Sequence, residues 1–140
     1  MRVLLDTCIL SELRRPKADP RVRARLESIP ESDLFLSVVT LGELTHGISR
    51  LTPGKRRREL DAWLSQIEQF YASRIFTIDI ETARIWGEIT ARASKKGNTI
   101  PIADGLIAAT ALRHGLHLMT RNSPHFQATG ILLLDPWRDS

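Results

Sequence analysis

Short runs of apolar residues recur along the chain, separated by longer amphipathic segments. The runs lie at residues 3–5, 34–39, 75–78, 116–119 and 131–134, and most of them are continuous rather than alternating with polar residues. Continuous apolar runs of this length are typical of strands that are buried on both faces. The pattern therefore predicts about five short, buried strands.

Helical patterns fill the segments between these strands, at 9–13, 21–29, 41–51, 56–71, 80–96 and 102–114. In the segment 80–96, Ala83, Trp86, Ile89 and Ala93 lie three or four residues apart, which predicts one buried helix face. Strands that alternate with helices are joined by crossovers, so we predict an α/β fold: a mainly parallel sheet flanked by helices on both faces. No linker or repeat divides the sequence, so we expect residues 1–140 to form a single domain.

Several helix ends are predicted by their chemistry. Thr40 and Glu43, three residues apart, form a capping-box pattern at the start of a helix. Pro101 suits the first position of the helix that follows it. Gly97 and Gly115 are placed to end their helices in a left-handed turn.

Composition excludes several classes of protein. A chain of 140 residues, 42% of them hydrophobic, is long enough to bury a core without a metal or disulfide staple. The apolar runs are far shorter than the roughly 20 residues of a membrane-spanning helix, and the start of the chain has no signal-peptide pattern. Cys8 is the only cysteine, which excludes intrachain disulfides. We expect a soluble, cytoplasmic protein with no membrane partner.

Positive charge is concentrated in the first part of the chain. The net charge is +4, and residues 1–60 hold 12 basic and 8 acidic residues whereas the rest is balanced. The basic residues gather in two clusters, Arg14, Arg15, Lys17, Arg21, Arg23 and Arg25, and then Lys55, Arg56, Arg57 and Arg58. Such clusters can neutralise phosphates of a nucleic acid, but they are also typical of solvated helix faces, and the charge alone leaves both interpretations open.

Polar residues follow the predicted strands at positions that meet in a parallel sheet. Asp6 follows the first strand, Glu43 lies in the helix after the second, Asp104 lies in the first turn after Pro101, and Asn122 follows the fourth strand. Right-handed crossovers bring such positions to one edge of the sheet, where α/β proteins bind their ligands.

These residues have structural and functional interpretations. Taken singly, each suits a helix cap or a turn. Taken together, three carboxylates in one crevice repel one another unless they share a proton or a cation. Oxygen ligands without histidine or cysteine favour Mg²⁺ or Mn²⁺.

Three segments resemble the PIN-domain ribonucleases, and most closely the VapC-type toxins of bacterial toxin–antitoxin pairs. These segments are VLLDTCILSEL at 3–13, LSVVTLGELTHGI at 36–48 and IADGLIAATALRHGLHLMTRN at 102–122. Their order and spacing extend the resemblance over nearly the whole chain. It implies a PIN-like α/β/α sandwich and a Mg²⁺-dependent endonuclease in which Mn²⁺ can substitute.

The resemblance also implies roles for individual residues. The acids that match Asp6, Glu43 and Asp104 bind the metal, Asn122 stands where the family often has aspartate, and hydroxyls matching Thr7 and Thr120 hold the acids and metal waters. The family often has asparagine in place of Cys8.

Partners follow from the same resemblance. It implies an RNA substrate, a cognate VapB-type antitoxin that blocks the site, a homodimer, and binding to operator DNA only through the antitoxin. Because phosphate contacts give affinity without sequence reading, we expect the RNA backbone to contact basic residues from the two clusters: Arg14, Arg15, Lys17, Lys55, Arg56 and Arg57.

The neutral Asn122 changes the charge of the predicted site. Three acids give a formal charge of −3, and one bound Mg²⁺ leaves −1, so a second ion should bind weakly. We therefore expect one tightly held ion, and a second only if it arrives with the substrate phosphate.

Other chemistries fit the sequence less well. A haloacid-dehalogenase phosphatase would require an aspartate at the position of Cys8. Gly115 separates His114 from His117, so the two need not share a face as a zinc pair would. Cys8 has no neighbouring histidine in sequence that could activate it as a nucleophile. A non-catalytic subunit whose acidic crevice binds a basic peptide stays open as the alternative function.

Overall fold

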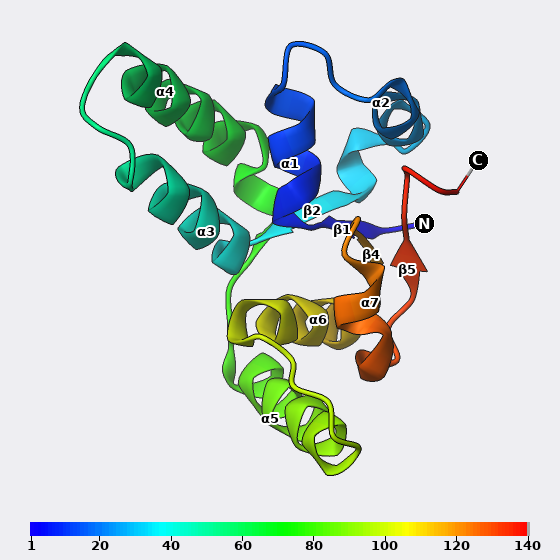
Figure 1. The fold of residues 1–140 in the computed structure, drawn as a ribbon. Helices are drawn as coiled ribbons and strands as arrows, with labels where there is room; N and C mark the ends of the chain where they lie inside the picture. The colour runs from blue at the N-terminus through cyan, green and yellow to red at the C-terminus, as the bar shows by residue number, and fades with distance from the viewer. Residues whose placement is uncertain (140) are drawn as a thin grey trace.

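A computed structural model describes residues 1–139 and contains one five-stranded parallel sheet (Figure 1). The strand order is β3-β2-β1-β4-β5, and all four pairings are parallel. The strands are β1 (Val3–Leu5), β2 (Leu34–Ser37), β3 (Ile75–Phe76), β4 (His117–Met119) and β5 (Leu133–Leu134). The predicted sheet of about five strands is confirmed, although most strands are shorter than the apolar runs that predict them.

Within residues 1–139, seven α-helices connect the strands, together with three short 3₁₀ turns at Glu31–Asp33, Ala72–Arg74 and Gln127–Thr129. The helices are α1 (Thr7–Arg14), α2 (Pro20–Glu27), α3 (Val38–Ser49), α4 (Lys55–Phe70), α5 (Ile80–Lys95), α6 (Ile102–His114) and α7 (Ser123–Phe126). Six of them coincide with predicted helical segments, whereas the one-turn helix α7 has too few residues for a periodic pattern.

Successive strand residues point to opposite faces of the sheet, which divides the core in two. Val3 and Leu5 pack into a core with residues of α1, α2, α3 and α4, whereas Leu4 packs into a second core with residues of α5, α6 and α7. The strands are therefore apolar except for Ser37 and His117 at strand ends, because both faces are covered. Figure 1 shows these two helical layers above and below the sheet, which confirms the predicted α/β/α architecture.

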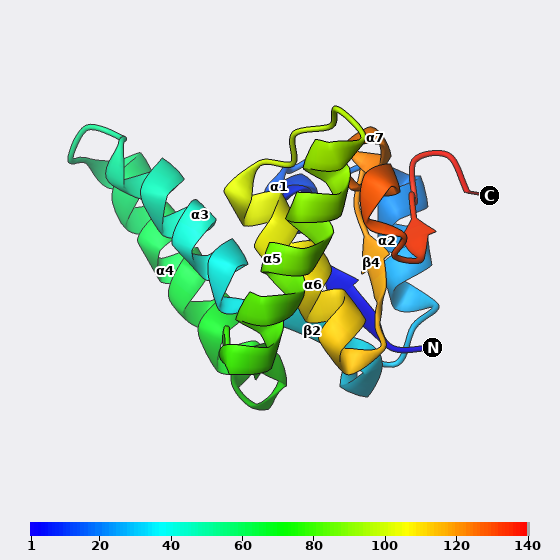
Figure 2. The same cartoon turned by 90° about the horizontal axis from the view of Figure 1, so that it is seen from below.

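The helices also form two neighbouring pairs. Helices α3 and α4 lie side by side and extend to one side of the molecule, while α5 and α6 pack together on the opposite face (Figures 1 and 2). Within the described residues, no helix is both long enough and apolar enough to cross a bilayer.

The capping box predicted at Thr40 is wrong. Helix α3 begins three residues earlier than predicted, at Val38, and Ser37 is its N-cap, with the side-chain oxygen accepting a hydrogen bond from the backbone N–H of Val39 at 3.1 Å. Thr40 is instead fully buried inside the helix. The shift also ends β2 at Ser37, so the apolar residues that follow belong to the helix.

Other predicted helix details need smaller corrections. Pro101 is the N-cap of α6 rather than its first helical residue. Ala83 is exposed, and Thr82 is buried in its place on the inner face of α5. Gly97 and Gly115 have positive φ angles of 79° and 66°, so the predicted left-handed helix ends are confirmed.

Candidate active site at the carboxyl edge of the sheet

The chain changes direction in the sheet between β1 and β4. From β1 it proceeds outward through β2 and β3, and it then returns to place β4 on the other side of β1. The carboxyl ends of the two strands are tied together, because the backbone N–H of Asp6 donates to the carbonyl of Met119 at 3.0 Å. Parallel α/β sheets leave a crevice for ligands at such a point.

Asp6 lies at the centre of this edge. It is the N-cap of α1, and its Oδ1 accepts a hydrogen bond from the backbone N–H of Thr7 at 2.8 Å. Its Oδ2 accepts a hydrogen bond from the Thr120 hydroxyl at 2.7 Å, and the Cys8 thiol lies 3.8 Å from the same oxygen. Asp6 therefore caps a helix and, with only 4% of its surface exposed, is also held in a fixed orientation at the strand end.

Glu43 is exposed on α3 and reaches the same edge. Its Oε1 accepts a hydrogen bond from the hydroxyl of Thr7 at 2.6 Å. Because Ser37 caps α3, the carboxylate of Glu43 is not occupied with the start of its own helix. Glu43 is therefore not part of a capping box. Its contact with Thr7 connects α3 to α1.

Asp104 and Asn122 approach from the other half of the sheet. Asp104 lies in the first turn of α6, and its Oδ2 is 3.1 Å from Nδ1 of His125. Asn122 precedes α7 but its side chain makes no capping hydrogen bond, while its backbone N–H donates to the Thr120 hydroxyl at 3.0 Å. The Asn122 side chain is therefore not occupied in holding the helix start.

These residues share one cleft of about 480 Å³. The three acids and Asn122 line it, together with Thr7 and Cys8, basic side chains from two elements, and further residues of α1 and the C-terminal segment. The complete lining is Asp6, Thr7, Cys8, Ser11, Glu12, Arg14, Arg15, Glu43, Asp104, Arg121, Asn122 and Trp137. Four positions that are far apart in sequence thus meet in one place, with cations beside them.

The electrostatics of the cleft disfavour an ionised Asp6. Burial raises the pKa of its carboxyl above the ordinary value, and the nearby charges of Asp104 and Glu43 raise it further. The hydrogen bonds from Thr120 and Thr7 act in the opposite direction by stabilising the carboxylate. Neighbouring positive charge would stabilise all three acids together.

The donor set fits a hard divalent cation. The acids offer only oxygen ligands, and Mg²⁺ and Mn²⁺ prefer oxygen. As the side chains stand, no three His, Cys, Asp or Glu residues among residues 1–139 form a metal-binding group, and Thr7, Thr120 and His125 each contact one oxygen of a cleft carboxylate. A metal would therefore have to replace some of these contacts or bind partly through water, as Mg²⁺ commonly does.

Comparison with known proteins identifies the family. Residues 3–131 match the family described as PIN domain. The chain belongs to the PIN-domain family. Among its relatives, the toxin FitB of Neisseria gonorrhoeae is 39% identical over 138 residues, covering 98% of this chain and 99% of FitB. The VapC ribonuclease Y4jK of Sinorhizobium fredii is 34% identical, covering 96% of this chain and 97% of that protein.

Solved structures agree with this assignment. The structure of FitAB bound to an IR36 DNA fragment contains a chain that superposes on this PIN domain with a TM-score of 0.92 and 36% identity. The match covers 99% of this chain and 97% of the other. The resemblance to PIN-domain toxins inferred from the three sequence segments is therefore confirmed.

The predicted basic residues are distributed unevenly around the PIN-domain cleft. Arg14 and Arg15 line it, and Arg56 lines the groove next to it, which also contains Arg14 and Trp63. Three others lie outside the cleft: Lys17, Lys55 and Arg57. Arg57 donates a hydrogen bond to the backbone carbonyl of Leu51. RNA contact by these residues stays a prediction.

Several residues in or beside the cleft of this PIN domain were not singled out from the sequence as part of the site. Arg121 and Trp137 line the cleft, as does the buried Glu12, and His125 contacts Asp104. Arg121 could have been found because it lies between Thr120 and Asn122. Trp137 and Glu12 carry no comparable signal, since only the folded chain brings them to this edge.

The alternative chemistries gain no support. Burial, followed by the charge of Asp6, raises the pKa of the Cys8 thiol to about 11, which disfavours the nucleophilic thiolate. The His114 ring stacks on Phe76 with centroids 3.8 Å apart, and no metal-binding group includes it within residues 1–139. Cys8 also leaves the PIN domain without the second aspartate of a haloacid-dehalogenase phosphatase.

Proposed function

We propose that this PIN domain is a metal-dependent ribonuclease toxin that hydrolyses RNA phosphodiester bonds and is held inactive by a cognate antitoxin. The observation that carries the proposal is the convergence of Asp6, Glu43, Asp104 and Asn122 in one cleft at the reversal point of the sheet. The names of the relatives support it, since one is a toxin and another a VapC ribonuclease.

In this proposal Asp6, Glu43 and Asp104 hold Mg²⁺ or Mn²⁺, and the ion when bound supplies Lewis-acid polarisation of the phosphate and a water of lowered pKa. Thr120 and Thr7 keep the Asp6 carboxylate in place through hydrogen bonds of 2.7 and 2.8 Å. The Thr7 hydroxyl also orients Glu43. Preorganised ligands of this kind reduce the reorganisation needed for the reaction.

Asn122 and the basic residues complete the site. An asparagine contributes a neutral carbonyl oxygen, so three acids leave a formal charge of −3 and one divalent ion reduces it to −1. We therefore propose one tightly held ion. Arg14 and Arg15 line the cleft and would bind the RNA backbone, because guanidinium groups form two parallel hydrogen bonds to phosphate.

The proposed partners are an antitoxin that covers the cleft, operator DNA bound through that antitoxin, and a second copy of the chain as a homodimer in the cytoplasm. The structure of FitAB bound to DNA supports this arrangement by analogy, since its PIN chain is similar over nearly the full length.

An RNA-cleavage assay tests the function. The purified chain is incubated with several RNAs in Mg²⁺ and in EDTA, and Asp6→Asn is assayed in parallel. We expect cleavage only by the wild type in Mg²⁺. Cleavage in EDTA would exclude the metal mechanism, and an inactive wild type with every RNA would favour the non-catalytic binding role.

A further inference from the structure

Arg121 is an exposed arginine that directly follows Thr120, just after the end of β4. It lines the cleft with the three acids, and its backbone N–H donates to the Cys8 sulfur at 3.4 Å. Within residues 1–139 its guanidinium has no carboxylate oxygen within 4.0 Å. The charge of Arg121 is thus present in the cleft without being neutralised by an ion pair.

The guanidinium of Arg121 contacts an aromatic ring rather than a carboxylate. The Arg121 guanidinium lies over the Trp137 ring at 4.9 Å from the centroid, and Trp137 is 7% exposed. The indole contacts the flat face of the guanidinium. The N–H groups at the edge of the guanidinium therefore remain available to donate hydrogen bonds. Arg15 differs, because it lines the same cleft but donates to Glu12 at 3.2 Å.

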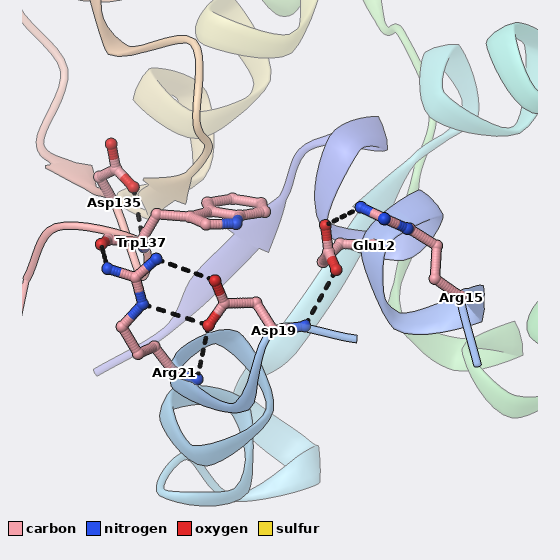
Figure 3. Close-up of polar contacts among 6 residues, drawn as sticks. All are labelled: Glu12, Arg15, Asp19, Arg21, Asp135 and Trp137. Carbon is pink, nitrogen blue, oxygen red and sulfur yellow. Dashed lines mark hydrogen bonds and ion pairs between the residues drawn. The ribbon is translucent and has the colours of Figure 1, made fainter. Parts of the chain in front are cut away.

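The indole is itself fixed by the C-terminal segment (Figure 3). The backbone N–H of Trp137 donates to Asp135 Oδ1 at 2.9 Å, and the carbonyl of Trp137 accepts a hydrogen bond from Arg21. Arg21 is held in turn by Asp19, at 2.9 Å between Nη2 and Oδ2. Trp137 also packs into the core formed with α1 to α4. The backbone of Trp137 is therefore joined to α2 by a hydrogen bond, and its side chain is held by packing in the core.

We infer that Arg121 binds a phosphate of the RNA at the cleft and that Trp137 is the positioning residue that orients it. This inference rests on the proposed ribonuclease function. An RNA phosphate that approaches three carboxylates is repelled unless cations accompany it, and Arg121 is a cation of the cleft whose donors no carboxylate occupies. Its planar fork matches the geometry of two phosphate oxygens.

Binding measured without turnover tests the role of Arg121. Affinity for a short single-stranded RNA is determined in EDTA over a range of salt concentrations for the wild type and Arg121→Gln. We expect about tenfold weaker binding at low salt, as for the loss of one charge-assisted contact. The slope of log K against log salt should fall by about 0.7, the value for one phosphate contact on a single strand.

The matched control is Arg84→Gln, which removes the same charge from an exposed position on α5 that does not line the cleft. It should leave the slope unchanged. If both variants change the slope equally, the effect is one of net charge, and the assignment of Arg121 is overturned. An unchanged slope in Arg121→Gln overturns it as well.

Trp137 is tested through its coupling to Arg121. Trp137→Phe keeps an aromatic face and should bind RNA nearly as the wild type, whereas Trp137→Leu should lose affinity. Adding Arg121→Gln to Trp137→Leu should cause little further loss, because the second change removes a contact already lost. Additive losses would show that Trp137 affects RNA binding independently of Arg121, which would overturn its role as the positioning residue. Trp137→Met replaces the leucine variant if that variant does not fold, as judged by near-UV circular dichroism.

The outcome separates this inference from the proposed function. If the wild type neither binds nor cleaves RNA, the ribonuclease proposal fails. If the wild type cleaves RNA in Mg²⁺ and Arg121→Gln keeps the wild-type salt dependence, only the role of Arg121 fails.

Discussion

Asp6 combines two demands that conflict at the level of a single residue. Its carboxylate caps α1 and accepts from Thr120, yet burial and two nearby acids disfavour its charge. Removal of the charge should therefore relieve repulsion, while the amide of asparagine can still accept from the Thr7 N–H. A residue whose only role is capping would lose about 1 kcal/mol on substitution by alanine but little on substitution by asparagine, which caps helices equally well.

The variant Asp6→Asn should therefore melt in EDTA at the wild-type temperature or above it, and it should lose the stabilisation that Mg²⁺ gives the wild type. Differential scanning fluorimetry with and without Mg²⁺ measures both effects. Asp61→Asn is the control, because Asp61 is exposed on α4 outside the cleft. An equal stabilisation of the wild type and of Asp6→Asn by Mg²⁺ would contradict a role of Asp6 in metal binding.

Residue types and their positions after strands were sufficient to select Asp6, Glu43, Asp104 and Asn122, because parallel strands bring their carboxyl ends to one edge. The partners of these side chains were less accessible. His125 is exposed one turn after Asn122 and contacts Asp104, but a single histidine in a turn gives no periodic or spacing signal.

The start of α3 shows how competing caps decide an element boundary. Both Ser37 and Thr40 are preferred N-cap types, and Glu43 makes Thr40 the better match to a capping box. The structure uses Ser37. As a result, the Thr40 hydroxyl is buried without a hydrogen-bond partner in the described part of the chain, and Glu43 turns to Thr7.

This arrangement predicts opposite effects for two similar substitutions. Ser37→Ala removes the cap and should lower the free energy of unfolding by about 1 kcal/mol. Thr40→Val replaces an unpaired buried hydroxyl by a methyl group of similar volume and should leave stability unchanged or higher. Urea denaturation measures both variants. A larger loss in Thr40→Val than in Ser37→Ala would restore Thr40 as the important cap residue.

The contact between α5 and α6 depends on Gly105. A Cβ added at this position would lie 2.8 Å from the Trp86 ring, whereas one added at Gly87 of α5 would meet nothing within 4 Å. Gly105→Ala should therefore destabilise the protein despite the better helix propensity of alanine, because the ring is part of the packed core.

Gly87→Ala provides the matched control and should stabilise the protein by up to about 1 kcal/mol through helix propensity. Thermal unfolding compares the two variants. Equal stabilisation by both would mean that Trp86 moves aside without loss of packing energy.

The end of α6 packs against β3 through a histidine, since the His114 ring stacks on Phe76. Burial against Phe76 lowers the pKa of His114, and the Arg113 and Arg2 charges lower it further while Asp79 and Glu81 oppose them. The unfolded chain, with a pKa near 6.5, thus binds a proton more readily than the folded one. The contribution of neutral His114 is complete above that pH and is lost as pH falls through the lower folded value.

The substitution His114→Phe keeps an aromatic ring stacked on Phe76 and removes the group that binds a proton. The variant should lose less stability than the wild type between pH 7 and pH 5, as measured by melting temperature in EDTA. His46→Gln, on the exposed face of α3, serves as the control for a general effect of histidine removal. An unchanged pH dependence in His114→Phe would exclude this origin of acid sensitivity.

At the scale of the whole molecule, the apolar runs predicted the sheet well because every strand is covered on both faces. The order of the strands in the sheet was harder to predict from the sequence. The return of the chain from β3 to a position beside β1 is set by how α5 and α6 cover the sheet, and no local pattern encodes it. For the same reason, Trp137 could not be assigned to the cleft before the C-terminal segment was seen beside α2.

Metal binding should stabilise the molecule as a whole, since only the folded sheet brings the three acids together. At a Mg²⁺ concentration about ten times its dissociation constant, the free energy of unfolding should rise by about 1.4 kcal/mol. Chemical denaturation at several Mg²⁺ concentrations measures this increase. A stability that does not depend on Mg²⁺ up to millimolar concentrations, compared with an equal ionic strength of Na⁺, would contradict the proposed site.

The cleft takes its lining from Asp6 near one end of the chain and from Trp137 near the other. The cleft is therefore complete only when segments from distant parts of the chain have docked against each other. Arg121 has no ring beneath its guanidinium until the segment around Trp137 has packed beside α2. Local disorder of that segment would thus alter a charge at the cleft while leaving the three acids on their own elements.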